Sequence, residues 1–423
     1  MNICLVGINH RTAPVAIREK AAIRTAQLDD ALQSLHPRLS HGVILSTCNR
    51  TEVYYTTDDD SDAKTVILGF LQNLLDVSDT VLRKHTYVLN GEASVEHLFR
   101  IASGLDSMVT GEYEVLGQVR QALEIAEKAK MVNLPLRHVF QSAVRTGRRV
   151  RKETGISKNA FSTSSVAVDL AASIVTCLEG CKMLVVGTGE AGRLVAKAAK
   201  DRGVSHIAVA SRSRERGLKL TKTLGGMLVS LSNLVAELHS CNIIVTCSNA
   251  PHFVLDVTKV DMAMRKRPEL PLVIIDIAVP RNVEPAVGQI NNVFLYNIDD
   301  LASISERNRY RRKSAVREAE NIIAAEMNKF NSWWQDFKIR PLISAIMDKA
   351  EKIRLAQLNR TVKKMPSLSD RELYSLEMMT RAIITKILKD PIRFLKDNRD
   401  SDYDYTDIVK ELFQLSKIKR DDE

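Results

Sequence analysis

The segment 183–200 constrains the fold of this chain more strongly than any other. An apolar run, Met183-Leu-Val-Val186, leads directly into Gly187-Thr-Gly-Glu-Ala-Gly192 and then into a helical pattern. In that setting the first glycine allows a tight turn, the second lets the backbone approach a pyrophosphate, and the third lets the helix pack on the strand. The helix N-terminus then holds the anion. We therefore predict a Rossmann domain with cofactor contacts at Gly187, Thr188, Gly189, Glu190, Ala191 and Gly192; a tight turn that binds nothing is the alternative.

The next predicted strand indicates which dinucleotide is bound. Ile207-Ala-Val-Ala210 ends in Ser211-Arg212-Ser213, where enzymes selective for NAD usually carry an acidic residue for the ribose 2′-hydroxyl. A guanidinium and two hydroxyls suit a 2′-phosphate instead, through charge-assisted hydrogen bonds. We expect NADPH as the cofactor, with Ser211, Arg212 and Ser213 at the phosphate. The alternative for Arg212 is a solvated loop charge.

The length of the chain indicates several domains. Its 423 residues exceed one compact core, and about two to four domains are expected. Two largely continuous apolar runs, Ile243–Cys247 and Leu272–Ile277, are typical of strands buried on both faces of a parallel sheet. Small polar residues at 155–165 predict a linker. We expect an α/β multidomain protein with a catalytic domain at 1–155, an NADP-binding Rossmann domain at 156–297 and a helical region at 298–423.

The first ninety or so residues alternate strand and helix signals. Strands are predicted at 3–8, 42–47, 52–57 and 86–89, with helices at 16–35 and 63–75. This order is a split β-α-β unit, which indicates a ferredoxin-like α+β subdomain. From 92 to about 155 the pattern is helical, with Val95, Leu98, Ala102 and Leu105 on one stripe. A helical layer therefore completes the predicted catalytic domain.

The last part of the chain predicts a long helix followed by shorter ones. Residues 298–337 contain no proline or glycine, and we expect Pro341 to end or kink the helix that they form. Further helices are predicted at about 342–363, 370–389 and 405–417. An all-α tail with an apolar seam is more typical of a dimerisation domain than of a catalytic one. A closed monomeric bundle is the alternative.

Composition limits the other classes of function. The six cysteines form no C-x-x-C pair and no zinc-ligand spacing, which favours reduced thiols in a cytoplasmic protein and no metal site. The N-terminus carries no basic signal region, and no apolar run is long enough to cross a membrane. A net charge of +10 permits RNA as a partner. Two basic clusters, at 145–152 and 307–313, fit either nucleic-acid contact or a solvated helix face.

Cys48 is the thiol best placed for chemistry. It lies where the apolar stretch Val43-Ile-Leu45 gives way to polar residues, and Arg50, two residues later, favours a thiolate. The other cysteines lie in or beside apolar strands or near a helix end, where they serve as small hydrophobic residues. The local pattern alone also fits a structural thiol at Cys48.

Several segments together resemble glutamyl-tRNA reductase. They are Gly7-Ile-Asn-His-Arg-Thr-Ala-Pro14, Ser46-Thr-Cys-Asn-Arg-Thr-Glu52, His97-Leu-Phe-Arg-Ile-Ala-Ser-Gly-Leu-Asp-Ser-Met108, Leu116-Gly-Gln-Val119, the segment 187–192 and Ile275-Asp-Ile-Ala-Val-Pro-Arg281. They follow the order and approximate spacing of the family over nearly the whole chain. The resemblance implies an NADPH-dependent reduction of glutamyl-tRNA(Glu) to glutamate 1-semialdehyde, the first step of C5-pathway tetrapyrrole (porphyrin) biosynthesis. It also implies a homodimer joined through the helical tail and a glutamate-1-semialdehyde aminotransferase as the partner that receives the aldehyde.

The resemblance further assigns roles to residues. Cys48 would form a thioester with the glutamyl group, and His97 would act as an acid, a base or an orienting group. This chain departs from the family at Tyr113 and Glu114, where the family commonly has proline and glutamine. The resemblance therefore does not define the polarity of the pocket at these two positions. Arg50 is the candidate partner of a substrate carboxylate, and an ion pair that stabilises the helix or loop is the alternative. The residues implied in the glutamyl pocket are Thr47, Cys48, Asn49, Arg50, Ser107, Glu112, Tyr113, Glu114 and Gln118.

Two other functions fit the same sequence. An NADP-dependent dehydrogenase of the shikimate type would share the Rossmann domain and leave the Cys48 loop structural. A catalytically silent RNA-binding dimer would keep the fold for regulation. Replacement of Cys48 separates both from a glutamyl-tRNA reductase, because only the reductase needs the thiol as a nucleophile.

Overall fold

The computed structural model describes residues 2–57, 60–108, 112, 114–154, 156, 163–175, 178–301, 313–397 and 405–415. The chain forms two compact units, Met1–Ala324 and Ala325–Glu423. Tyr113 lies outside the described residues, as do most of the predicted linker 155–165 and most of the basic cluster 307–313.

A four-stranded antiparallel sheet forms the beginning of the first unit. Its strands are β1 (Asn2–Asn9), β2 (Gly42–Ser46), β3 (Arg50–Thr57) and β4 (Tyr87–Asn90), in the spatial order β2-β3-β1-β4. The two central strands pair in register from Asn2 with Thr57 to Asn9 with Arg50. This is the ferredoxin-like strand order, and it confirms the fold predicted from the alternating pattern.

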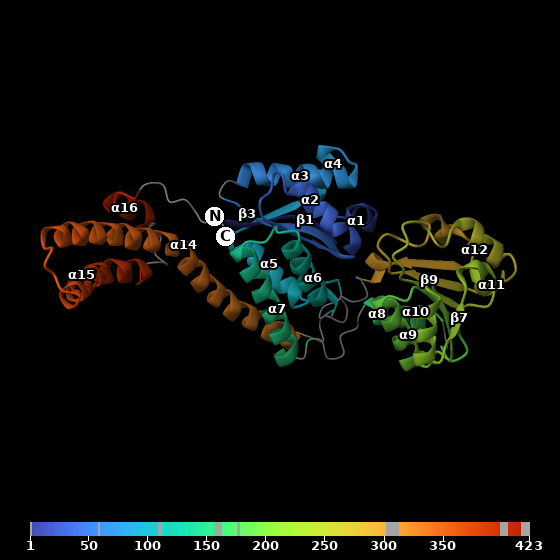
Figure 1. Cartoon of the computed structure of the whole chain (residues 1–423). Coiled ribbons are helices and arrows are strands. Elements are labelled where there is room, and N and C mark those ends of the chain that lie inside the picture. The colour runs from blue at the N-terminus through green and yellow to red at the C-terminus, as the bar shows by residue number, and fades with distance from the viewer. Residues whose placement is uncertain are drawn as a thin grey trace. The chain divides into compact units, whose positions relative to one another are not determined.

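Helices cover both faces of this sheet (Figure 1). On one side lies α3 (Asp60–Leu75), followed by α4 (Asp79–His85), and on the other lie α5 (Glu92–Ala102), α6 (Glu114–Lys128) and α7 (Leu134–Thr154). The prediction of a single helix over 16–35 is wrong. The chain forms α1 (Val15–Ala21), the 3-10 turn η1 (Thr25–Gln27) and α2 (Leu28–Leu35) instead.

The break after α1 has a local cause. Ala22 is extended, with φ −69° and ψ 119°, and the backbone N–H of Ile23 donates to Ser46 Oγ at 3.0 Å. Ile23 is buried. A helical Ile23 would lose this anchor to the end of β2, so tertiary contacts override the helical periodicity.

A six-stranded parallel sheet forms the rest of the first unit. Its strands are β5 (Lys182–Val186), β6 (His206–Ala210), β7 (Met227–Val229), β8 (Ile243–Thr246), β9 (Leu272–Asp276) and β10 (Val293–Asn297). They lie in the order β10-β9-β8-β5-β6-β7, and every neighbouring pair is parallel. This is the doubly wound Rossmann order, which brings the carboxyl ends of β5 and β8 together at the point where the strand order reverses.

Apolar side chains from alternate strand positions bury both faces of this sheet. One face packs against α8 (Thr163–Ile174), α9 (Glu190–Asp201) and α10 (Arg214–Leu224), and the other against α11 (Leu234–Leu238) and α12 (Val257–Met264). Within β5, Met183 and Val185 belong to the first core, while Leu184 and Val186 belong to the second. The strands are buried on both faces, as their continuous apolar runs predict.

The second unit is helical in its described residues. The helix α14 (Lys313–Lys364) begins in the first unit and continues into the second, where α15 (Asp370–Asp397) and α16 (Tyr405–Leu412) follow. The expectation that Pro341 ends the long helix is wrong, because α14 continues through it. Leu342 and Ile346, directly after the proline, are buried against α15 residues including Leu388 and Leu395. This packing offsets the backbone hydrogen bond that a proline removes.

No single helix of the described chain is long and apolar enough to cross a membrane; α3 and α4 meet that criterion only as a pair bent by 104°.

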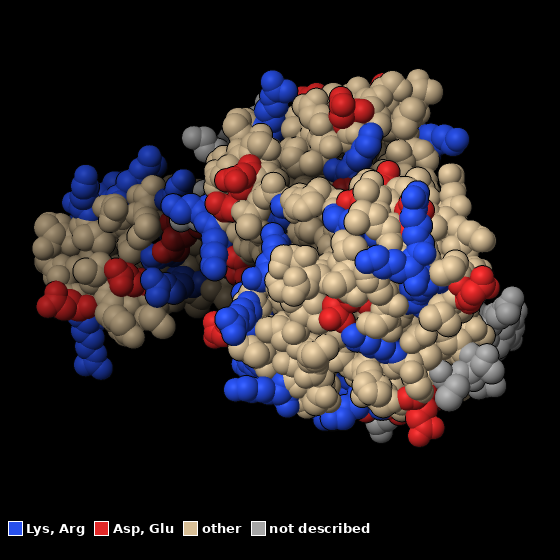
Figure 2. All heavy atoms as spheres, turned by 90° about the vertical axis from the view of Figure 1, so that its right-hand side faces the viewer, with Lys and Arg blue, Asp and Glu red and all other residues tan. Residues whose placement is uncertain are grey.

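Figure 2 shows how the charges are distributed on one face of the protein. Lys and Arg side chains are spread over that face with Asp and Glu side chains among them, and they do not form one continuous basic patch.

Candidate active site

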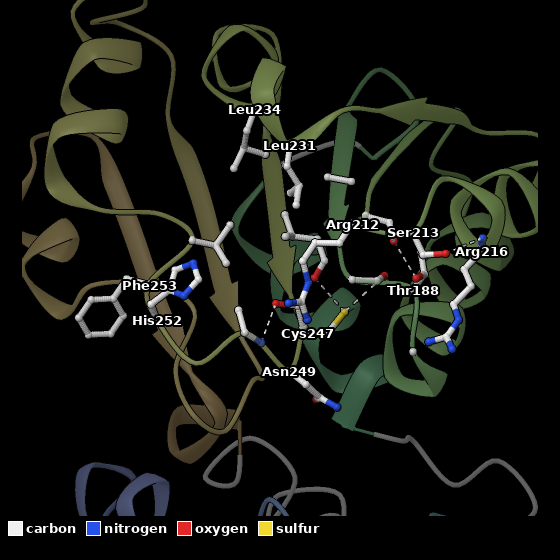
Figure 3. A pocket seen from close by; sticks show the side chains of 18 of the residues that line it. Thr188, Arg212, Ser213, Arg216, Leu231, Leu234, Cys247, Asn249, His252 and Phe253 are labelled. Atoms are coloured by element: carbon white, nitrogen blue, oxygen red, sulfur yellow. Dashed lines mark hydrogen bonds between the residues drawn. The ribbon is translucent and has the colours of Figure 1, made fainter. Parts of the chain in front are cut away.

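A cavity opens at the carboxyl ends of β5, β6 and β8. It has a volume of about 430 Å³. The turn after β5, the end of β6 and the loop after β8 form its walls (Figure 3). In Figure 3, Thr188, Ser213 and Arg216 lie on one side of the cavity and His252 and Phe253 on the other. This is where a doubly wound sheet binds its ligand.

Gly187 and Gly192 have the steric roles that the sequence predicts, and the contact of Gly189 with a pyrophosphate stays a prediction. Gly187 has φ +128°, and a Cβ atom there would lie 2.9 Å from the Cys247 carbonyl oxygen. At Gly192 a Cβ atom would lie 2.2 Å from the Gly187 carbonyl oxygen, so α9 can approach β5 only through a glycine. At Gly189 a Cβ atom would meet no described atom within 4 Å. The backbone therefore borders open space at the N-terminus of α9, which fits a pyrophosphate.

Hydroxyl and guanidinium groups line the β6 side of the cavity. Thr188 Oγ1 and Ser211 Oγ lie 2.9 Å apart, and Ser213 caps α10 by accepting from the Arg216 N–H at 3.3 Å. Arg212 and Arg216 both line the cavity. Arg216 was not predicted, although its position in the first turn of α10, the helix that follows β6, could have indicated it. Two guanidinium groups beside hydroxyls suit a phosphate better than a neutral ribose.

A buried carboxylate fixes the wall near β8. Asp276 accepts hydrogen bonds from Thr246 Oγ1 at 2.7 Å and from the backbone N–H groups of Ala278, Asn282 and Val283. Asn282 Oδ1 in turn accepts from the N–H and the hydroxyl of Ser248, at 2.9 and 2.7 Å. Burial raises the pKa of Asp276 to about 6, against the hydrogen bonds that lower it. These bonds hold Ser248 at the cavity.

Cys48 lies in the three-residue connection between β2 and β3. Thr47 Oγ1 accepts from the N–H groups of Asn49 and Arg50, at 3.1 and 3.2 Å, and the Thr47 N–H donates to the Arg50 carbonyl at 2.8 Å. The turn thus holds Cys48 at its apex, where the residue is half-buried. The thiol packs in a small apolar cluster with Val15, Met108, Val279 and Ile298. Val279 and Ile298 come from the segments after β9 and β10, so residues of the nucleotide-binding sheet lie beside the thiol.

The charges around Cys48 differ from those expected. Burial, followed by Glu112 and Glu114, raises the pKa of the thiol above its usual range, and Arg18 opposes them. The expectation that Arg50 favours the thiolate is wrong, because its guanidinium turns into the protein and bonds to Glu52 and Asp106. Arg18 is therefore the cation at the nucleophile, and the sequence pattern did not reveal it.

Arg50 and His97 belong to a buried polar network. Arg50 Nη1 lies 2.9 Å from Glu52 Oε1 and 3.0 Å from Asp106 Oδ2. His97 Nε2 lies 3.1 Å from Glu52 Oε1 and 3.2 Å from the Tyr87 hydroxyl. Although burial opposes it, Arg50 and His97 hold the pKa of Glu52 well below its usual range. No hydrogen bond joins His97 to Cys48 among the described residues. The contact of Arg50 with a substrate carboxylate stays a prediction.

The other predicted pocket residues divide into two groups. Glu112 and Glu114 lie close enough to Cys48 to shift its pKa, and burial followed by Glu114 raises the pKa of Glu112 to about 7. Ser107 hydrogen-bonds to Glu112, whose carbonyl also accepts from Arg151 Nη2 at 2.9 Å. Gln118 is half-buried on α6. Among the residues that the structure describes, no group of three or more His, Cys, Asp or Glu side chains could hold a metal ion.

Two buried polar atoms beside Cys48 have no hydrogen-bond partner among the described residues. They are Asn49 Oδ1 and His10 Nδ1. The two residues are neighbours, since the His10 N–H donates to the Asn49 carbonyl at 2.9 Å. Buried polar groups normally have partners, so this pair fits a place for polar groups of a ligand. Burial, followed by Arg50, lowers the pKa of His10 to about 4, which keeps its ring neutral.

Comparison with known families gives three matches along the chain. Residues 6–154 match the N-terminal domain of glutamyl-tRNA(Glu) reductase, and residues 318–415 match the dimerisation domain of the same enzyme. Residues 169–304, which hold the cavity, match the shikimate/quinate 5-dehydrogenase family.

Individual proteins resemble the chain over nearly its full length. The glutamyl-tRNA reductase of Natranaerobius thermophilus is 37% identical over 98% of this chain and 92% of its own. That of Moorella thermoacetica is 39% identical over 98% of this chain and 95% of its own. A solved structure of glutamyl-tRNA reductase from Methanopyrus kandleri is 33% identical and covers 95% of this chain and 99% of its own, with a TM-score of 0.48.

Proposed function

The chain belongs to the glutamyl-tRNA reductase family, and from this we infer that it reduces the glutamyl ester of tRNA to glutamate 1-semialdehyde, the first committed step of tetrapyrrole biosynthesis. The observation that carries this conclusion is 37% identity over 98% of the chain. A dehydrogenase of the shikimate type would account for the match at 169–304 alone. It would leave the matches at 6–154 and 318–415 unexplained.

The Rossmann domain binds a nicotinamide cofactor, and we propose that this cofactor is NADPH. Gly187 to Gly192 would hold the pyrophosphate, and Ser211, Arg212 and Ser213 would hold the 2′-phosphate, with Arg216 beside them. The lining supports this choice, because two arginines and three hydroxyls, from Thr188, Ser211 and Ser213, border the cavity. When bound, the cofactor supplies a hydride.

We expect Arg212→Ala to weaken NADPH binding about 10- to 100-fold and NADH binding less than about threefold, because a charge-assisted hydrogen bond is worth about 1.5–3 kcal/mol. Fluorescence titration of the purified protein with each nucleotide measures both effects. Arg265→Ala is the matched control, since Arg265 is an exposed arginine of the same domain that pairs with Asp261 and does not line the cavity. An equal loss for NADPH and NADH would contradict the 2′-phosphate assignment.

Cys48 is the proposed nucleophile. Its thiolate attacks the ester carbonyl, the bond to the tRNA oxygen breaks, and the tRNA hydroxyl leaves with a proton while the glutamyl group stays on sulfur as a thioester. Once that carbonyl is reduced, Cys48 would hold the anion of a thiohemiacetal. The carbon–sulfur bond then breaks, which releases the aldehyde and returns the thiolate. Packing of Cys48 against Val279 and Ile298 supports this assignment, because both belong to the nucleotide-binding half of the unit.

For His97 we propose an orienting role. Its Nε2 bonds to Glu52 and Tyr87, and its side chain is 14% exposed. His97 contacts Glu52, and Glu52 in turn holds Arg50 in place at the start of β3, directly after the nucleophile turn. A group committed to this network holds the turn in place, whereas an acid or base must reach the reacting atoms.

We propose that the glutamyl group lies above the nucleophile turn. Asn49 Oδ1, which has no hydrogen-bond partner in the described part of the chain, supports a contact with a substrate donor, and Glu112 and Glu114 offer carboxylates near the thiol. Tyr113 is retained in the proposed pocket, although it lies outside the described residues. The proposed lining is Thr47, Asn49, Arg50, Ser107, Glu112, Tyr113, Glu114 and Gln118.

The binding partners of the chain are inferred from its family. The match at 318–415 to a dimerisation domain supports a homodimer, and the substrate makes glutamyl-tRNA(Glu) a binding partner. We further propose a glutamate-1-semialdehyde aminotransferase as the receiver of the aldehyde and the cytoplasm as the compartment. The thiols of Cys241 and Cys247 are free, which supports a reducing compartment.

The direct test is an assay with the purified chain, glutamyl-tRNA and NADPH. We expect the absorbance of the reduced nicotinamide to fall in step with the appearance of aldehyde. Uncharged tRNA with free glutamate is the control, because a carboxylate without ester activation does not accept hydride. Oxidation of NADPH without any aldehyde, or reduction that does not need the aminoacyl ester, would contradict the proposed function.

A further inference from the structure

Arg18, on α1, connects the nucleophile turn to the segment that leaves the parallel sheet. Its Nη1 donates to the Cys48 carbonyl oxygen at 2.6 Å, and its Nε donates to the Ala13 carbonyl at 3.2 Å. Its Nη2 pairs with Asp299 Oδ1. The Arg18 side chain is 2% exposed, whereas the Asp299 side chain is 34% exposed, so the guanidinium is shielded from water and the carboxylate is only partly shielded. A guanidinium with three fixed acceptors has little freedom to turn.

Asp299 is itself held in place. Its Oδ2 accepts from the Val15 N–H, at the start of α1, at 3.0 Å. Its own N–H donates to Asn297 Oδ1, at the end of β10, at 2.7 Å. The carboxylate therefore links the first turn of α1, the Arg18 side chain and the end of the parallel sheet.

Arg18 also interacts electrostatically with the Cys48 thiol. The charged groups that act on Cys48 are Glu112, Glu114 and Arg18, and only Arg18 favours the thiolate. The charged groups that act on Arg18 are Asp299, Cys48 and Glu19. Charges in a shielded site interact more strongly than they do in water, so the balance between Arg18 and the carboxylates governs how readily Cys48 ionises.

We propose that Arg18 is a positioning residue for the nucleophile: it holds the Cys48 carbonyl, supplies the positive charge that stabilises the thiolate, and is kept in this orientation by Asp299. The inference rests on the proposed function, in which Cys48 attacks the ester. Arg18 acts through Cys48, and Asp299 acts through Arg18. Replacing one or the other should therefore move the ionisation of the thiol in opposite directions.

The test measures how fast iodoacetamide alkylates Cys48 in the full chain as a function of pH, with the modified peptide identified by mass spectrometry. Cys48→Ser gives the background from other thiols. We expect Arg18→Gln to move the midpoint to higher pH by about one unit, which slows alkylation below the midpoint about tenfold. We expect Asp299→Asn to move it to lower pH, because the carboxylate that neutralises Arg18 is gone.

Glu19→Gln is the matched control. Glu19 follows Arg18 on the same helix and pairs with Arg281 at 2.6 Å, with side chains that are 18% and 20% exposed. It makes no hydrogen bond to the nucleophile turn among the described residues. We expect its alkylation midpoint to move much less than that of Arg18→Gln, because Glu19 is the weakest of the charged groups that act on Arg18. A shift as large as that of Arg18→Gln would show that loosening α1 by itself moves the alkylation midpoint of Cys48, and this result would overturn the proposal.

Two further outcomes would also overturn it: an unchanged midpoint in Arg18→Gln, and an unchanged or higher midpoint in Asp299→Asn. The Asp299→Asn result decides the matter even if Arg18→Gln fails to fold. Alkylation needs no turnover, so a failure here leaves the thioester route intact. That route fails only if Cys48→Ser still produces aldehyde, which is a separate measurement.

Discussion

Replacement of Cys48 by serine is expected to lower aldehyde formation from glutamyl-tRNA by at least about a thousandfold, the scale typical of a lost nucleophile. A serine hydroxyl offers the same reach but ionises far less readily. The ester that it would form is also a poorer hydride acceptor and leaves an alkoxide that departs less easily than a thiolate. Steady-state rates with saturating NADPH and charged tRNA measure the loss.

The same variant should bind NADPH with unaltered affinity, because Cys48 does not line the cavity at β5, β6 and β8. Cys181→Ser is the control for a thiol-to-hydroxyl change, since Cys181 precedes β5 and is not a cavity residue. In the unaltered protein without NADPH, an acid quench followed by mass spectrometry should find glutamate attached to the Cys48 peptide. Near-normal turnover in Cys48→Ser, or the lack of any such adduct while product forms, would rule out the thioester.

Arg50→Met is expected to reduce the free energy of unfolding of the first unit by about 3–5 kcal/mol. The change removes the buried cation between Glu52 and Asp106, whose side chains are 0% and 5% exposed. Asp106 keeps its ion pair with the exposed Arg11, so Glu52 is the carboxylate that loses most. An uncompensated buried charge is the costly element, because the low dielectric of the interior cannot replace hydration. Urea unfolding, followed by circular dichroism, measures the shift of the midpoint.

A control and a rescue make this prediction specific. Arg83→Met breaks an ion pair with Asp79 in which the side chains are 68% and 58% exposed, and we expect no measurable shift of the unfolding midpoint. Adding Glu52→Gln and Asp106→Asn to Arg50→Met should recover part of the loss, because the unpaired charges are then removed. Equal stability of Arg50→Met and Arg83→Met would refute the account of the network.

The Rossmann domain could be predicted because its signals are local. A glycine turn between a strand and a helix has one steric solution, and Gly187, Gly189 and Gly192 each meet the surroundings that the motif requires. The strands of the first sheet were also predictable, since period-two patterns and turns specify them. The prediction of one helix over 16–35 was wrong because Ser46, which lies 23 residues after Ile23, accepts a hydrogen bond from the Ile23 N–H.

The orientation of side chains at the site could not be predicted from spacing. Arg50 is two residues from Cys48 in sequence, yet Asp106, 56 residues further on, helps turn its guanidinium inward. Arg18 has partners 30 and 281 residues away, at Cys48 and Asp299. Such contacts exist only after the sheet and the helices have assembled, so no pattern in a single sequence contains them.

The partnerless atoms at His10 and Asn49 have a practical consequence for inhibitors. Both atoms are buried, so a compound reaches Asn49 Oδ1 and His10 Nδ1 only if the nucleophile turn shifts to expose them; each bond that it then makes adds affinity without displacing a protein partner among the described residues. Because the His10 ring is neutral, a permanent negative charge on the compound gains nothing from it. The residues at the nucleophile turn therefore favour uncharged amides and alcohols that also carry a weak thiol-reactive group.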